Sequence, residues 1–154
     1  MAFNQFDVGA QTVSYTTGLK TAIAVKTSTN VCVKLMEARF SFDGATSGNA
    51  PAQCEFDQIT FATNSPGTNS TTATPAKLDT GRAETIQATA GITWTAQPTV
   101  ITLQWPIAVG QYNGIYHYIN PFVSPFIIIG GKGGGISVNT PNTVNFSGSL
   151  HGEE

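Results

Sequence analysis

The stretch from Thr143 to Leu150, Thr-Val-Asn-Phe-Ser-Gly-Ser-Leu, decides the fold class of this chain. Val144, Phe146 and Leu150 share one parity, and polar residues occupy the other. Successive side chains of a β-strand point to opposite faces, so this alternation predicts a strand with one buried and one solvent-facing side.

Short runs of the same kind recur along the chain. They cover Thr12–Thr16, Thr21–Val25, Val31–Phe42, Ala52–Phe61, Val100–Trp105, Ile115–Ile119, Phe126–Ile129 and Ile136–Val138. Turn-forming pairs such as Asp43-Gly44 and Asn113-Gly114 separate them, and no segment combines a helical period with caps at both ends. We therefore expect an all-β fold, an antiparallel β-sandwich of eight or nine strands, with the jelly roll as the favoured topology.

A chain of 154 residues fits one domain. We expect residues 1–10 to form an N-terminal arm and residues 11–154 to form a single jelly-roll β-sandwich. The stretch Thr63–Ala76, rich in Thr, Ser, Asn and Pro, is predicted to be a long exposed loop. The run Gly130–Gly135 is predicted to be a flexible connection between strands rather than a phosphate-binding loop, because no Ser or Thr follows its Lys.

Two of the predicted strands, Val31–Phe42 and Ala52–Phe61, each change their buried parity part-way along. If both change face at the same level, they form an antiparallel hairpin with Phe40 opposite Cys54 and a bulge or bend near Met36. We predict that hairpin, with a loop over Asp43–Pro51.

The same register places Arg39 opposite Glu55 and Glu37 opposite Asp57 on an outward face. A carboxylate pair is what glycoside hydrolysis requires, and two carboxylates can also hold a cation. A surface charge ladder fits better, because an exposed sheet face offers no desolvated pocket to raise the pKa of a carboxyl group.

The register also holds Cys32 and Cys54 roughly 26 Å apart, whereas a disulfide needs Cα atoms within about 7 Å. We expect two free, largely buried thiols.

The composition is poor in the side chains that carry out catalysis or bind metals. Charged residues make up 10% of the chain, only two His and two Cys occur, and the net charge is -2. Such a chain lacks the usual groups of an active site and the basic face that nucleic acid requires. The two histidines, His117 and His151, are too few for the metal site of a cupin. We therefore expect no catalytic residues, no cofactor, no metal, no nucleic acid and no membrane partner. The start of the chain carries no secretory signal pattern, which indicates synthesis in a cytoplasm.

Apolar and aromatic residues are in surplus between Gln111 and Ile129. Along the strand Ile115–Ile119, Ile115, His117 and Ile119 face one way and the tyrosines the other. This region is either a central strand covered on both sides or an oligomer interface. The N-terminal arm is a second candidate anchor, its alternative being a frayed terminus, and we expect that residues 2–9 can be deleted without loss of the fold. The candidate interface comprises Phe3, Phe6, Val8, Tyr112, Tyr116, Tyr118 and Phe122.

The chain as a whole resembles small β-sandwich proteins of tailed bacteriophages, among them jelly-roll decoration (cement) proteins of the head. The resemblance lies in the polar leader, Phe42-Asp43-Gly44, Thr95-Ala96-Gln97-Pro98-Thr99, Trp105, Gly135-Ile136-Ser137-Val138 before Thr140-Pro141, and the closing strand that ends in Glu153-Glu154. The Tyr-rich stretch from Tyr112 to Tyr118 departs from that pattern. The resemblance implies a non-catalytic virion protein, typically a homotrimer, that binds the major capsid protein on the outer capsid surface.

Two other functions stay open. A receptor- or carbohydrate-binding jelly-roll module of a phage fibre or tail would present aromatic side chains beside amides, as Trp94 with Gln97 or Tyr112 with Asn113 could. An enzyme would need a pocket that the fold assembles from distant residues.

Overall fold

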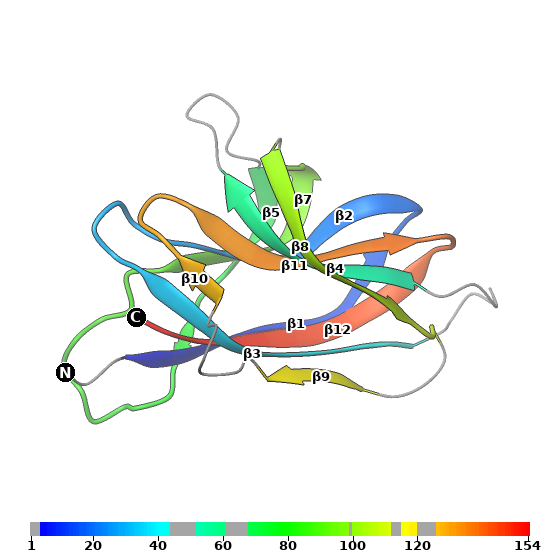
Figure 1. Ribbon diagram of the computed structural model, residues 1–154. Coiled ribbons are helices and arrows are strands. Elements are labelled where there is room, and N and C mark those ends of the chain that lie inside the picture. The colour runs from blue at the N-terminus through cyan, green and yellow to red at the C-terminus, as the bar shows by residue number, and fades with distance from the viewer. Residues whose placement is uncertain (1–3, 44–51, 61–67, 99, 112–114, 120–125) are drawn as a thin grey trace.

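The protein is a sandwich of two antiparallel β-sheets (Figure 1). The structure, a computed structural model, describes residues 4–43, 52–60, 68–98, 100–111, 115–119 and 126–154, with the backbone alone for residues 53–60, 68–70 and 100–105. No helix within these ranges has the length and apolar character required to cross a membrane.

Sheet A is the lower layer in Figure 1. Its strands are β1 (Gln5–Tyr15), β3 (Val33–Phe42), β6 (Ala76–Lys77), β9 (Tyr116–Ile119), β10 (Phe126–Ile128) and β12 (Val144–Glu153). They lie in the order β10-β3-β12-β1-β6, and β9 also pairs with β3.

Sheet B is the upper layer. Its strands are β2 (Gly18–Lys26), β4 (Ala52–Thr60), β5 (Thr68–Ala73), β7 (Thr89–Ala96), β8 (Val100–Val109) and β11 (Gly133–Thr140), in the order β5-β7-β2-β11-β4-β8. The described part of the chain thus contains twelve strands, more than the eight or nine expected. The additional strands include β5, within the predicted loop Thr63–Ala76, and β6, which begins at the end of that loop. They also include β7, whose Thr, Ala and Gly residues give no apolar alternation.

The predicted strand at Thr143–Leu150 is confirmed as part of β12, which lies between β1 and β3 in sheet A. Val144, Phe146 and Leu150 are at most 1% exposed. Gly148 shares their parity, and a Cβ there would come within 2.7 Å of the Phe146 ring and of the Arg39 carbonyl oxygen. The inward position 148 is therefore a glycine, because the Phe146 ring already occupies the space that a side chain there would need.

The core lies between the two sheets and takes side chains from both. Its largest fully buried members include Phe6, Ile23, Leu35, Ile128, Ile136, Phe146 and Leu150. An aromatic cluster joins Phe146 to Tyr15, Phe40 and Phe42, with ring centroids 5.9–6.1 Å apart. Burial of this much apolar and aromatic surface is the main source of stability in such a fold.

Two expectations for the first strands are corrected. Residues 5–10 are not an arm, because they form the first part of β1, which pairs along its length with β12. Phe6 and Val8 are 0% and 1% exposed. Deletion of residues 2–9 would remove both from the core, so the burial of these residues argues against the expectation that the fold survives this deletion.

The predicted hairpin is also wrong. β3 lies in sheet A and β4 in sheet B, so Phe40 lies opposite Gly148 and Tyr116, and Cys54 opposite Val138 and Ile107. The parity change in β3 is real, because Met36 is an extra residue between Leu35 and Glu37 in the pairing with β12. Strand β4, in contrast, runs against β11 without a shift. Consecutive strands from β1 to β4 alternate between the sheets, so neighbours in the sequence are not neighbours in a sheet.

Two smaller expectations also change. Cys32 is a free cysteine as predicted, but it is exposed rather than buried, and the Cys54 side chain lies outside the described part. In the run Gly130–Gly135, the last three glycines belong to strand β11. A Cβ on Gly135 would lie 2.0 Å from the Ile23 carbonyl oxygen, so close approach of β2 requires glycine there.

Candidate functional site: the outer face of sheet A

The outward side of sheet A carries most of the charged side chains that the structure brings together. Asp7 lies between the buried residues Phe6 and Val8 of β1, and Glu37 and Arg39 flank the buried Ala38 of β3. The same alternation turns Ser149 and His151 of β12 outward around Leu150, and His117 of β9 outward between two tyrosines. Because side chains alternate along a strand, these residues all face away from the core.

The register of the strands brings these side chains into neighbouring rows. His151 lies opposite Asp7 on one side and opposite Glu37 on the other, and Arg39 lies opposite Ser149 and His117. Both histidines of the chain therefore flank Glu37.

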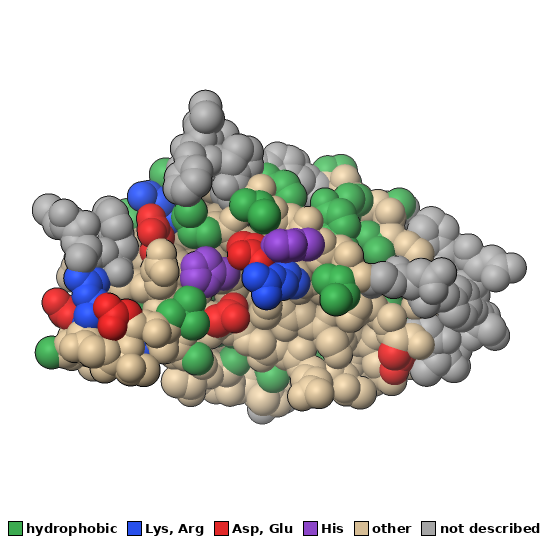
Figure 2. All heavy atoms as spheres, turned by 90° about the horizontal axis from the view of Figure 1, so that it is seen from below, with side chains coloured by type: hydrophobic (Ala, Val, Ile, Leu, Met, Phe, Trp, Pro, Cys, Tyr) green, Lys and Arg blue, Asp and Glu red, His purple; other side chains and the backbone are tan. Residues whose placement is uncertain are grey.

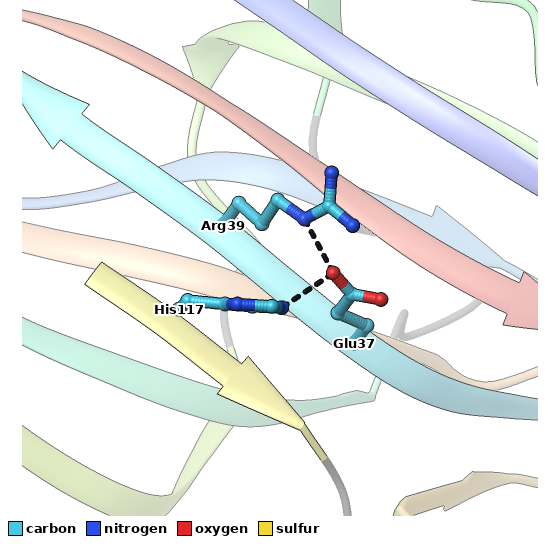
Figure 3. A network of polar contacts seen from close by, with 3 residues as sticks. All are labelled: Glu37, Arg39 and His117. Carbon is cyan, nitrogen blue, oxygen red and sulfur yellow. Dashed lines mark hydrogen bonds and ion pairs between the residues drawn. The ribbon is translucent and has the colours of Figure 1, made fainter. Parts of the chain in front are cut away.

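Glu37 is the centre of a polar network (Figure 3). Its Oε1 accepts hydrogen bonds from Nε of Arg39 and from Nε2 of His117. The hydrogen bond from Arg39, together with the one from His117 and their charges, lowers the pKa of the Glu37 carboxyl against the opposing effect of desolvation. The side chains of Arg39 and His117 are 58% and 41% exposed, so water reaches the network. A second pair on the same sheet, Lys34 and Glu153, has a 3.0 Å contact.

Beside this network lies a shallow hollow of about 240 Å³. Its lining residues are Asp7, Glu37, Arg39, Leu78, Ser149 and His151. Oδ1 of Asp7 is buried and has no hydrogen-bond partner among the described residues. An unsatisfied buried acceptor costs free energy, so a donor from a bound molecule would be stabilised there. Within the described part of the chain, no three His, Cys, Asp or Glu side chains are arranged to hold a metal ion.

Apolar side chains border the charged ones. Ile119 lies directly opposite Glu37 and is 66% exposed, and Ile127 lies opposite Lys34 and is 45% exposed. Leu78, in the lining of the hollow, is 51% exposed. Figure 2 shows this face with the histidine, arginine and acidic side chains at its middle and hydrophobic side chains next to them. Exposed aliphatic side chains that gather on one face are a feature of surfaces that bind protein.

Four of the seven interface residues predicted from the sequence lie in the described part of the chain, and these four are buried or partly buried. Phe6 and Val8 are core residues and offer no surface to a partner. Tyr116 and Tyr118 are partly buried and pack against the core, Tyr116 with its ring centroid 4.9 Å from that of Phe40. Burial and the neighbouring Tyr116 raise the pKa of the Tyr118 hydroxyl. Phe3, Tyr112 and Phe122 lie outside the described residues.

The expected alternation along Ile115–Ile119 is confirmed, since Ile115, His117 and Ile119 are exposed and the tyrosines between them partly buried. The exposed side of this segment is therefore the isoleucine side. The alternation places Ile119 on that side from the sequence alone, although aromatic content favours the tyrosines as the contact residues.

The predicted carboxylate pair of Glu37 and Asp57 does not form. Asp57 and Glu55 belong to β4 in sheet B, whereas Glu37 belongs to sheet A. The pairing of Arg39 with Glu55 is wrong for the same reason. Arg39 instead binds Glu37 on its own strand, as it would in a surface charge cluster.

Comparison of the chain with protein-family models, with curated proteins and with solved structures gives no match. The functional conclusion therefore rests on the geometry of the fold and of this face.

Proposed function

We propose that this chain is a jelly-roll protein that decorates and stabilises a bacteriophage capsid without catalysing a reaction. It docks on the major capsid protein through the outer face of sheet A and assembles as a homotrimer. The observation that carries the proposal is the composition of that face, where the exposed Ile119, Ile127 and Leu78 surround a largely self-neutralised charge network.

The strand pairing supports the jelly-roll topology. In a jelly roll, one long antiparallel ribbon folds over, so that the first strand pairs with the last and the second with the next to last. Here β1 pairs with β12, β2 with β11, β3 with β9 and β10, and β4 with β8. The cross-pairs β3–β12 and β4–β11 join neighbouring turns of the ribbon into two sheets. Strands β5, β6 and β7 are then an insertion between the fourth and fifth strands of the roll.

The electrostatics of the face support docking on protein. The charges of Arg39 and Lys34 are already neutralised by Glu37 and Glu153, so covering these pairs leaves few unpaired ions. The free Oδ1 of Asp7 offers one acceptor for a backbone or side-chain donor of the capsid subunit. A trimer would present three copies of the face, and modest single contacts would reinforce one another.

The absence of catalysis is supported by the exposure of the titratable groups. General acid–base catalysis works best when burial or a like charge shifts a pKa towards neutrality. On this face the shift of Glu37 is in the opposite direction, and both of its partners are open to water.

The test is recovery of the protein with purified phage particles, combined with one substitution on each sheet. Ile119→Lys places a charge in the apolar border and should lower occupancy on the particle about tenfold or more, since a buried unpaired charge costs more than 1.4 kcal/mol. Leu19→Lys is the matched control, because Leu19 is 41% exposed on β2 of sheet B, and occupancy should not change. Light scattering at micromolar concentration should give the mass of a trimer.

A strictly monomeric protein that is absent from purified particles would overturn the proposal. Equal occupancy of Ile119→Lys and wild type on particles would reject the outer face of sheet A as the docking surface.

A further inference from the structure

A second hollow lies at the seam where the end of β1 in sheet A meets β2 and β7 of sheet B. It measures about 210 Å³, and its lining residues are Val13, Ser14, Tyr15, Thr16, Lys20, Thr93, Trp94 and Gln97. The Tyr15 hydroxyl crosses the seam beneath it, with the carbonyl oxygens of Ile92 at 2.7 Å and Ala22 at 3.1 Å as acceptors. Strands from both sheets therefore hold the hollow in a fixed shape.

The lining combines three kinds of group that sugars use. Trp94 supplies an aromatic surface, on which the C–H side of a pyranose ring can pack. The side-chain amide of Gln97 is fixed by one hydrogen bond, in which its Oε1 accepts from the Thr21 backbone N–H at 2.8 Å, and its NH₂ group adds two donors. Hydroxyl groups of Ser14 and Thr16 can both donate and accept.

The charge of the hollow further limits the class of ligand that it can bind. Lys20 contributes one positive charge, and no Asp or Glu is among the described residues of the lining. No ion pair of Lys20 is found within the described residues. An ammonium group beside an aromatic side chain and hydroxyls favours a ligand that carries a single negative charge.

We propose that this seam hollow binds one acidic sugar unit, a hexuronic acid whose carboxylate meets Lys20 and whose ring packs on Trp94. Ligand pockets for drug-sized molecules measure about 300–1,000 Å³, so a hollow of this size takes a single ring and leaves its neighbours in a polysaccharide outside. The seam hollow and the hollow on the outer face of sheet A have no lining residue in common, so the sugar site does not depend on that face. A decoration protein with this site would attach a particle to acidic polysaccharide, which is a further activity beyond capsid binding.

The experiment titrates the intact protein with glucuronic acid and, separately, with glucose, and follows both by ligand-observed NMR and calorimetry. Wild type should bind glucuronic acid with a dissociation constant on the order of 1 mM and glucose more weakly, because glucose lacks the carboxylate. Lys20→Gln should weaken glucuronic acid binding about fivefold and leave glucose binding unchanged. Lys26→Gln is the matched control, since it removes the same charge from the other end of the same strand and should change neither.

A second pair of variants tests the aromatic surface. Trp94→Ala should weaken both sugars about tenfold, whereas Trp94→Phe keeps a ring and should retain most of the binding. Circular dichroism and thermal melting of each variant establish that the β fold is present.

Equal affinity for glucose and glucuronic acid, or a Lys20→Gln variant that matches Lys26→Gln, would overturn the assignment of an acidic sugar. No binding of either sugar by folded wild type would reject the site. Neither result bears on binding to phage particles, which the substitutions at Ile119 and Leu19 test separately. Failure of the sugar site is therefore distinct from failure of the proposed function.

Discussion

The hollow on the outer face of sheet A and the hollow at the seam differ in how they hold charge. On the outer face, Glu37 lies between Arg39 and His117, so the positive and negative groups pair within the chain. At the seam, Lys20 is the single charged group among the described lining residues. The first has exposed isoleucine and leucine beside it, and the second has tryptophan, hydroxyl groups and an amide.

This difference indicates two kinds of ligand. When another protein covers a surface whose ions are already paired, few charges are left without a partner, which avoids the large cost of burying a lone charge. A concave site with one unpaired ion and several donors gains more from a small polar molecule that supplies the missing charge. One small sandwich can therefore hold a protein-binding face and a sugar site at separate places.

The largest expected effect comes from the core residue that supports both regions. Phe146 is fully buried on β12, whose outward side chains line the outer hollow, and it packs on Tyr15 beneath the seam. Phe146→Ala should lower the free energy of unfolding by about 3–5 kcal/mol and weaken both binding activities together. Ser149→Ala, on the opposite side of the same strand, should cost less than about 0.5 kcal/mol. Urea unfolding measures both, and equal stability of the two variants would contradict the packing described for β12.

The alternation in Val144–Leu150 predicted a strand correctly because a half-buried strand must separate apolar from polar side chains. The β-sandwich follows from many such strands. That β3 pairs with β12 and β9, and not with β4, was not predictable from the same signal, since a parity change reports a bulge within one strand and not the partner across it. The bulge at Met36 arises against β12, more than a hundred residues away in the sequence.

A second, smaller effect should separate the two regions. Tyr15→Phe removes the hydroxyl that donates to the carbonyls of Ile92 and Ala22, so we expect a loss of about 1 kcal/mol in stability. Burial raises the pKa of this hydroxyl, which therefore stays protonated as a donor at every ordinary pH. Glucuronic acid binding should weaken, while occupancy on phage particles should not change. Tyr116→Phe is the control on β9, and a loss as large as that of Tyr15→Phe would show that the seam bonds are not the cause.

The candidate sites were predictable only in part. Trp94 with Gln97 is visible as an aromatic beside an amide, three residues apart, but Lys20 and Ser14 reach the same hollow only through the folding of β1 and β2 against β7. Likewise, no local pattern connects Asp7, Glu37 and His151, because their row depends on the register of three strands from distant parts of the chain. Aromatic content misled for a physical reason. Tyr116 packs on Phe40, and both tyrosines of β9 are partly buried against the core, so the aromatic side chains of this strand face inward.

The smallest expected effect tests whether the network of Glu37, Arg39 and His117 contributes to the free energy of unfolding. The pKa of Glu37 is lower in the folded protein than in the unfolded chain, first through the hydrogen bond from Arg39 and then through that from His117. Its stabilisation is therefore present at neutral pH and is lost as the pH falls below about 4.5 and the carboxyl takes up a proton. Because both partners are exposed and screened by water, we expect less than about 1 kcal/mol, or a difference in melting temperature of at most about 4 °C. Glu37→Gln should melt slightly below wild type at pH 7, and the difference should shrink as the pH falls and Glu37 takes up its proton, whereas Glu84→Gln, an exposed position outside the network, should follow wild type throughout. A loss of several kcal/mol in Glu37→Gln at pH 7 would mean that the network is needed to hold the strands of sheet A together. The outer face would then be a structural element of the sheet and not a surface kept for a partner, as the comparison with the seam requires.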